Sequence, residues 1–143
     1  GQYDAIILAE AGLGRLGLAE RIGLVLAPPL IFPAVSQGAL GIECRADDTV
    51  TRDLLAQLAC PVTTAEVLAE RSLLRTLRAG CHAPLGVWCS VEQQQLTLTG
   101  VLLSHDGSTR LEQTVCGMTT EPEVAGQQVA EQLLGCGAES LLQ

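Results

Sequence analysis

The sequence contains no lysine. All eight basic residues are arginines, and sixteen acidic residues bring the net charge to −8. This balance argues against a nucleic-acid-binding surface, which needs basic residues to neutralise phosphates. Arginine grips carboxylates with a fixed fork, but a GC-rich coding bias would give the same composition, and we favour that simpler cause.

Long apolar runs are also missing. No stretch approaches the roughly 20 residues that a membrane-spanning helix needs, and the start "GQYDAIILAEAG" has no signal-peptide layout. The only methionine is Met118, so we expect the chain to be a fragment of a longer protein. With 143 residues, 48% of them hydrophobic, it can still build a domain with a core.

No two cysteines are spaced as C-x-x-C, which makes a structural zinc site improbable. The six cysteines are widely spaced and lie mostly in apolar runs, unlike the framework of a small secreted domain. We therefore expect reduced thiols in a cytoplasmic protein, at Cys44, Cys60, Cys81, Cys89, Cys116 and Cys136.

The second half predicts an α+β domain. A helix over residues 63–79 should begin with the capping box Thr63-x-x-Glu66 and end at Gly80, a residue suited to positive φ. Strands follow over 85–91, 95–104 and 109–117, the last two joined by the hairpin signal Asp106-Gly107. A second capping box, Thr120-x-x-Glu123, opens a final helix whose apolar face holds Ala125, Val129 and Leu133. Residues 61–143 thus read α-β-β-β-α, a three-stranded antiparallel sheet with helices on one face.

The first half predicts a fragment of an α/β sheet. Residues 3–9 indicate a short buried strand, residues 12–22 a helical segment, residues 40–44 another short strand, and residues 51–59 an amphipathic helix. One buried strand with one helix cannot pair its own edges, so we expect residues 1–58 to be partly disordered or to pair with another chain.

The stretch "GLGRLG" (residues 12–17) matches the glycine pattern of dinucleotide-binding loops. No second strand ending in an acidic residue follows at the usual distance, so nucleotide binding is a weak interpretation. Arg15 is the more interesting residue there, either as an anion contact or as a solvated surface side chain.

Cys81 lies between a predicted helix and a predicted strand, and its chemistry leaves several roles open. It could be a small buried hydrophobe, a metal ligand with His82 and Cys89, or a nucleophilic thiol assisted by Arg78 and His82. The residues alone favour the buried thiol. Arg71, Arg75 and Arg78 share one helical stripe that leads toward Cys81, and a solvated charged face explains that stripe adequately.

Three segments resemble one known family in matching order: "DAIILAEAGLGRLGL", "FPAVSQGALGIECR" and "ERSLLRTLRAGCHAPLG". The family is hydroxymethylbilane synthase, also called porphobilinogen deaminase. The departures are small: Ser36 stands where the family usually has glycine, Ala79 replaces one residue of a glycine pair, and His82-Ala83 differ.

The resemblance implies an enzyme that condenses four porphobilinogen molecules head to tail, releases ammonia and yields hydroxymethylbilane for tetrapyrrole (haem) biosynthesis. It also implies a dipyrromethane cofactor bonded by a thioether to Cys81, with Arg15 and Gln37 among the residues that contact cofactor or substrate. No metal is implied. The whole enzyme would be a cytoplasmic monomer that binds neither nucleic acid nor membrane.

The family has three domains. The resemblance assigns residues 1–36 to the end of the second, periplasmic-binding-protein-like domain, residues 37–58 to a segment that returns to the first, and residues 61–143 to the C-terminal cofactor-attachment domain. The catalytic aspartate would lie in the missing N-terminal domains, since it is matched by none of Asp4, Asp47, Asp48, Asp53 and Asp106. The fragment alone should be inactive. The alternative is a non-catalytic binding module for a small anionic ligand.

Overall fold

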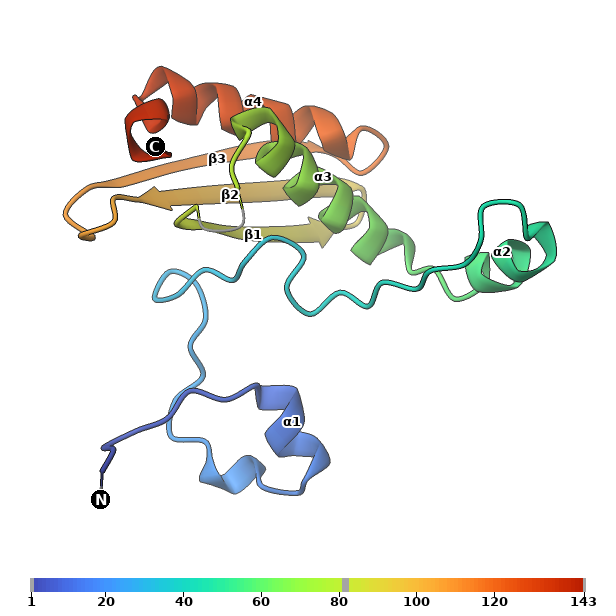
Figure 1. The fold of residues 1–143 in the computed structure, drawn as a ribbon, viewed down its shortest axis with the longest axis horizontal. Helices are drawn as coiled ribbons and strands as arrows, with labels where there is room; N and C mark the ends of the chain where they lie inside the picture. Colours follow the sequence, from blue (N-terminus) through green and yellow to red (C-terminus); the bar gives the residue numbers. More distant parts are fainter. Residues whose placement is uncertain (1, 81–82, 143) are drawn as a thin grey trace. The chain divides into compact units, whose positions relative to one another are not determined.

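A computed structural model describes residues 2–80 and 83–142, which divide into two compact units, Gly1–Ile31 and Phe32–Gln143. The first unit holds α1 (Glu10–Arg15) and the 3₁₀ turn η1 (Ala19–Arg21). The second holds α2 (Thr49–Ala56), α3 (Pro61–Leu77), the strands β1 (Leu85–Glu92), β2 (Gln95–Leu103) and β3 (Arg110–Met118), then α4 (Pro122–Gly135) and the 3₁₀ turn η2 (Ala138–Leu141) (Figure 1).

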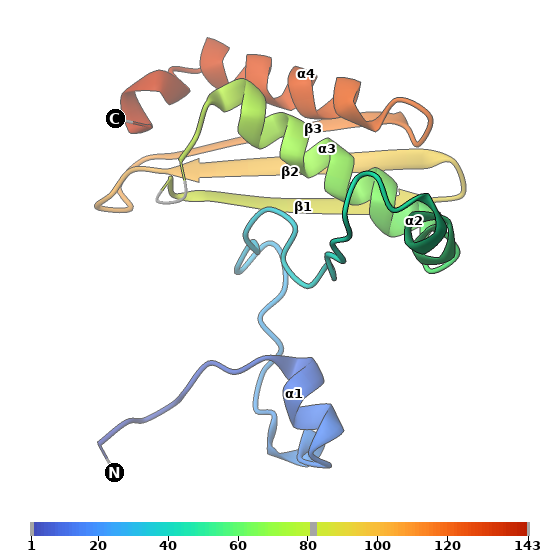
Figure 2. The same cartoon turned by 45° about the vertical axis from the view of Figure 1, so that its right-hand side comes forward.

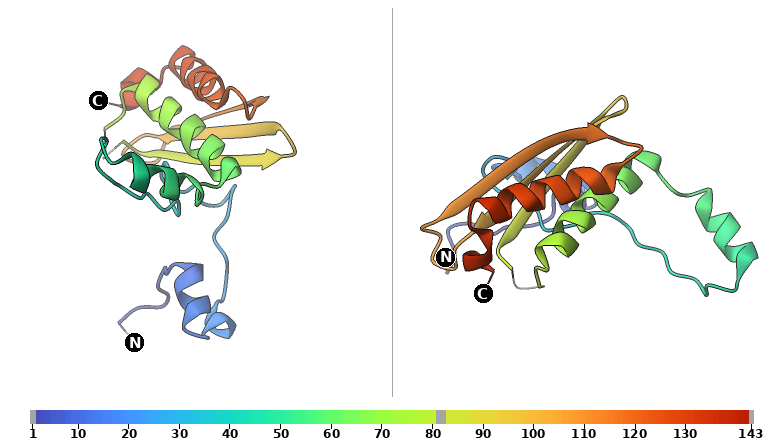
Figure 3. Two further views of the ribbon diagram at one scale, coloured as in Figure 1. Left: turned by 90° about the vertical axis from the view of Figure 1, so that its right-hand side faces the viewer. Right: turned by 90° about the horizontal axis from the view of Figure 1, so that it is seen from above.

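The three strands form one antiparallel sheet in the order β1-β2-β3. Trp88 on β1 pairs with Thr99 on β2, which pairs in turn with Thr114 on β3. Helices α3 and α4 lie side by side over the same face of the sheet, as Figures 2 and 3 show from different directions. The α-β-β-β-α prediction for the second half is therefore confirmed.

The core lies between this sheet and the two helices. Alternate residues of β2 point into it, and Leu96, Leu98 and Leu102 are fully buried. They meet Leu73 of α3 together with the face of α4 that carries Val129 and Leu133. Full burial stabilises each such side chain by about 1.5–3 kcal/mol, so this one layer holds the domain together. The predicted apolar face of the last helix is confirmed.

Helices α3 and α4 also meet through polar groups. The Ser72 hydroxyl donates a hydrogen bond to the Glu123 carbonyl at 2.8 Å. The Arg75 guanidinium pairs with the Glu123 carboxylate at 2.7 Å. The ion pair is exposed and adds little to the stability of the domain. The buried Ser72 hydroxyl, by contrast, needs a hydrogen-bond partner, and its bond to Glu123 fixes how the two helices align.

The helix ends differ from the prediction. Pro61 and Pro122 each occupy the first turn of a helix, so the N-cap residues are Cys60 and Glu121 and no side chain caps either helix. The two predicted capping boxes are therefore wrong: a proline in the first turn already supplies the helical φ and has no N–H to satisfy. Helix α3 ends at Leu77, and Arg78, not Gly80, takes the left-handed conformation with φ of 52°.

The predicted strand over residues 3–9 is absent. Those residues form no ladder, and Tyr3, Ile6, Ile7 and Leu8 are exposed. The helical segment is shorter than predicted, since α1 ends at Arg15. A strand exists only when a neighbour takes up its backbone N–H and C=O groups, and the unit Gly1–Ile31 offers none.

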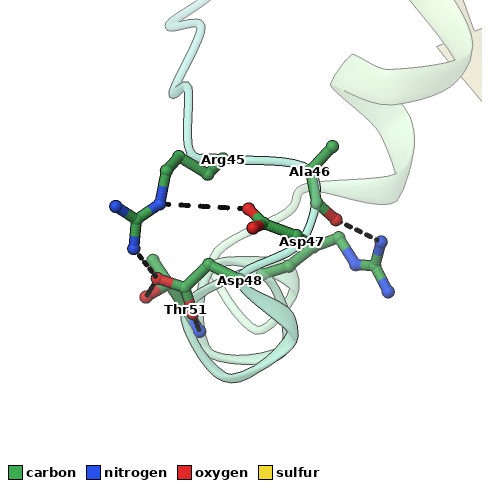
Figure 4. A network of polar contacts seen from close by, with 6 residues as sticks. Arg45, Ala46, Asp47, Asp48 and Thr51 are labelled. Carbon is green, nitrogen blue, oxygen red and sulfur yellow. Dashed lines mark hydrogen bonds and ion pairs between the residues drawn. The ribbon is translucent and has the colours of Figure 1, made fainter.

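The predicted strand over residues 40–44 is absent for the same reason. Beyond it, α2 begins at the N-cap Asp48, whose carboxylate accepts hydrogen bonds from the Thr51 N–H at 3.0 Å and the Thr51 hydroxyl at 2.8 Å (Figure 4). These bonds, the backbone one first, lower the pKa of Asp48. Arg45 lies 3.9 Å from Asp47 and Asp48 in the same surface network.

None of the helices described over residues 2–80 and 83–142 is both long enough and apolar enough to cross a membrane.

Candidate functional site

The cysteine loop joins α3 to β1, and the residues on both sides of it are held by backbone hydrogen bonds. The Arg78 N–H donates to the Arg75 carbonyl at 3.1 Å and closes the helix. The Ala83 N–H donates to the Gly80 carbonyl at 3.0 Å, and the Leu103 N–H donates to the Pro84 carbonyl at 3.1 Å, which extends the ladder of β2 toward the loop. Cys81 and His82 themselves lie outside the described residues.

The three arginines of the predicted helical stripe are exposed, as a solvated charged face requires. Arg71 and Arg75 lie on α3, whereas Arg78 follows the end of the helix and is not part of a stripe. Arg75 is occupied by Glu123, whereas Arg71 and Arg78 form no ion pair within residues 2–80 and 83–142. Arg78 is the last cationic residue before Cys81 in the chain, and its exposed guanidinium is available to an anionic group.

Cys89 is a core thiol. It is buried on β1, and burial above all, followed by the charges of Glu70 and Glu66, raises its pKa to about 12. At neutral pH the side chain is neutral and makes a poor nucleophile or metal ligand. Among the described residues, no group of three or more His, Cys, Asp or Glu side chains is placed to hold a metal ion.

Arg15 is the last residue of α1 and is exposed. The glycine pattern around it does not form a dinucleotide-binding loop, because no strand precedes α1 within residues 2–9. Arg15 has no ion-pair partner in the part of the chain that the structure describes, so its guanidinium is free to donate two parallel hydrogen bonds to a carboxylate.

Gln37 is exposed in a turn of the second unit, where its N–H donates to the Ala34 carbonyl at 3.0 Å. The residue before it, Ser36, has φ of 61°, a left-handed conformation that favours glycine. The Ser36 N–H donates to the Glu70 carboxylate at 2.6 Å. No sequence pattern indicates this contact, because the two residues are 34 positions apart.

The fold defines a two-part chain: a glycine-bearing segment with one short helix and a 3₁₀ turn, then an α+β domain with a cysteine loop between α3 and β1. Residues 1–53 match the family profile described as the porphobilinogen deaminase dipyromethane cofactor binding domain. Residues 64–135 match the profile described as the porphobilinogen deaminase C-terminal domain.

Curated relatives agree. The chain is 46% identical over 142 residues to the porphobilinogen deaminase of Synechococcus elongatus, 44% identical over 142 residues to that of a Nostoc species, and 46% identical over 143 residues to that of Gloeobacter violaceus. The chain belongs to the porphobilinogen deaminase family. In each comparison 99% of this chain is aligned, but it spans only 44% of the relative's length.

Proposed function

We propose that this chain is the C-terminal portion of a hydroxymethylbilane synthase, the transferase that joins four porphobilinogen molecules in tetrapyrrole biosynthesis. The observation that carries the proposal is the pair of family profiles, matched in order along the chain, the first of which names the dipyromethane cofactor. We further propose that the whole enzyme is a cytoplasmic monomer.

In this proposal Cys81 is the attachment point of the dipyrromethane cofactor. Loss of ammonia from porphobilinogen leaves an electrophilic methylene carbon, and a thiolate captures it to form a carbon–sulfur bond. The bound cofactor supplies a permanent primer for chain growth. Arg78 supports this assignment: it is exposed, it has no ion-pair partner among the described residues, and a cation close to Cys81 in the chain favours the thiolate.

Arg15 and Gln37 are proposed to bind acetate and propionate groups of cofactor or substrate. Arg15 is exposed and has no acidic partner among the described residues, which suits a carboxylate ligand. Gln37 offers a side-chain amide from an exposed turn. The family resemblance implies a catalytic aspartate that no residue of this chain matches, so we assign that group to the part of the relatives' length that this chain does not span.

The test is mass spectrometry of the longer enzyme and of its Cys81→Ala variant, intact and after digestion. We expect the parent enzyme to carry an added mass on the Cys81 peptide. The variant should lack this mass and should not turn over porphobilinogen. Cys116→Ala, which alters an exposed thiol on β3, should keep both the added mass and the activity. An unmodified but active enzyme, or a fully active Cys81→Ala variant, would refute the proposal.

A second test uses the 143-residue chain alone. Because the catalytic acid is assigned elsewhere, the chain should form no product from porphobilinogen above the uncatalysed rate. Robust product formation would show that the catalytic group lies within it.

A further inference from the structure

A short stretch of chain just before Gln37, residues 32–36, is fixed on the C-terminal domain. We call it the anchor segment. The Val87 N–H, at the free edge of β1, donates to the Pro33 carbonyl at 2.8 Å. A Cβ built on Gly86 would lie 2.6 Å from the Phe32 Cβ, so only glycine at position 86 lets Phe32 approach the strand this closely. Val35 packs against the buried core.

Glu70 of α3 binds the last residue of the anchor segment, Ser36. Its carboxylate accepts the Ser36 N–H at 2.6 Å, a short distance typical of a hydrogen bond to a charged acceptor. Among the described residues the Ser36 N–H has no backbone acceptor, whereas the Gln37 N–H beside it donates to the Ala34 carbonyl at 3.0 Å, so the Glu70 carboxylate satisfies the N–H that the turn itself leaves open. The Ser36 hydroxyl is buried and has no partner within the described residues, so the backbone contact alone joins this residue to α3.

We propose that Glu70 is a positioning residue for Gln37: its carboxylate fixes the turn that presents Gln37 and ties that turn to the helix leading into the Cys81 loop. Helix α3 then contacts the turn that carries Gln37 and leads, in the chain, into the loop that carries Cys81. The role for Gln37 rests on the proposed function; the contact between Glu70 and Ser36 does not.

The surroundings of Glu70 make the contact sensitive to pH. Burial raises its pKa most, the Ser36 N–H lowers it, and the charge of Glu66 one turn earlier on α3 raises it again. Cys89 faces it from β1 and stays neutral. The pKa of Glu66 is itself raised by burial. A protonated Glu70 carboxyl group is a weaker hydrogen-bond acceptor than the carboxylate. The hydrogen bond from the Ser36 N–H should therefore weaken as the pH falls through the raised pKa of Glu70.

The experiment measures amide hydrogen exchange of Ser36 by NMR in the 143-residue chain, with Glu70→Gln as the variant and Glu66→Gln as its matched control. Glutamine keeps the shape and a carbonyl acceptor but removes the charge, so we expect Ser36 to exchange about tenfold faster in Glu70→Gln. Glu66→Gln should leave the Ser36 rate unchanged at neutral pH.

The Ser36 amide shift should also titrate with the pKa of Glu70. Glu66→Gln removes a neighbouring charge and should move that midpoint to lower pH, while Glu70→Gln should abolish the titration. A role limited to filling space would change none of these readings. Equal Ser36 exchange in both variants, or a Ser36 shift that does not titrate, would overturn the proposal.

These measurements need neither cofactor nor substrate, so they fail or succeed independently of the proposed function. In the longer enzyme, Glu70→Gln should raise the KM for porphobilinogen in the same direction as Gln37→Ala, with Glu66→Gln as the control. If Ser36 responds as expected while Gln37→Ala leaves turnover intact, the contact stands and the role of Gln37 fails.

Discussion

Gly126 lies where α4 meets the backbone of α3. A Cβ built there would come within 2.2 Å of the Ala69 carbonyl oxygen and 2.8 Å of the Leu73 nitrogen. Backbone atoms of a helix cannot yield as a flexible side chain can, so the helices would have to separate. We expect Gly126→Ala to lower the free energy of unfolding by about 3 kcal/mol. Urea unfolding followed by the fluorescence of Trp88, the only tryptophan, measures it.

Gly135 provides the matched control, because it ends the same helix and its added Cβ would meet nothing within 4 Å. Gly135→Ala should leave stability unchanged or raise it by less than about 1 kcal/mol through helix propensity. Similar losses in both variants would show that the close contact between α3 and α4 is not what makes Gly126 necessary.

Two cysteines should differ sharply in reactivity. Cys60 is exposed, and the hydroxyl and N–H groups of nearby Thr63, the hydroxyl first, lower its pKa. Burial raises the pKa of Cys89 to about 12. Because the thiolate is the reactive form, iodoacetamide at pH 8 should alkylate Cys60 readily and leave Cys89 intact until the chain unfolds. Peptide mass spectrometry over time measures both rates.

Thr63→Val supplies the control for Cys60. It removes the hydroxyl that lowers the pKa of Cys60 but keeps the shape of the residue, so Cys60 should react more slowly while Cys89 stays protected. Alkylation of Cys89 at the rate of Cys60 in the folded chain would contradict the buried position of Cys89 on β1.

At the level of the elements, the turn between β2 and β3 depends on one carboxylate. Asp106 accepts hydrogen bonds from the Ser104 hydroxyl at 2.5 Å and from the Ser108 N–H at 3.1 Å, and Gly107 takes φ of 71°. These bonds, the Ser104 hydroxyl first, lower the pKa of Asp106 to about 2. The hairpin signal Asp106-Gly107 is thus confirmed.

The lowered pKa gives this turn a predictable pH dependence. An acid with a lower pKa in the folded state binds fewer protons when folded, so its contribution is complete above about pH 4 and is lost as the pH falls toward 2. Asp106→Ala should therefore be less stable than the parent chain at pH 7. The gap should shrink between pH 4 and pH 2 in urea titrations at several pH values. A gap that stays constant over that range would contradict the role of the ionised carboxylate.

Elements that satisfy themselves locally could be predicted from the sequence. The three strands follow one another through short turns, and the alternation of Leu96 and Leu98 with Thr97 already defined the buried face of β2. Residues 3–9 carry an equally strong apolar signal but no neighbouring strand. Whether an apolar run becomes a strand depends on a partner that local pattern cannot supply.

The candidate site residues also differ in whether the sequence alone could reveal them. Resemblance selected Cys81, Arg15 and Gln37 from their motifs, and it noted that Ser36 stands where glycine is usual. The left-handed φ of 61° explains that preference in physical terms. Glu70 could not be found in this way, because its contact with Ser36 arises only when α3 and the anchor segment come together in space. The domain assignments of residues 1–36, 37–58 and 61–143 stay a prediction.

On the scale of the whole molecule, the two units should differ in their protection from hydrogen exchange. In Phe32–Gln143 the sheet and two helices bury a continuous core, whereas Gly1–Ile31 contains no buried residue among those described. We expect amides of residues 2–31 to exchange at close to the unprotected rate, and those of α3, β2 and α4 to be slowed by several orders of magnitude. Hydrogen exchange with mass spectrometry resolves both regions. Uniformly strong protection of residues 2–31 in a monomer would contradict this expectation.

The contact between Pro33 and β1 has a consequence for how copies of the protein associate. A free strand edge is a template for pairing with another chain and so for aggregation. Pro33 offers a carbonyl to the Val87 N–H but has no N–H of its own, so it occupies the edge of β1 at this residue without presenting a new donor there. The other outer strand of the sheet, β3, carries the ion pair between Arg110 and Glu112 at 2.5 Å. Charged side chains discourage pairing at a strand edge, so the two outer strands oppose edge-to-edge aggregation by different means.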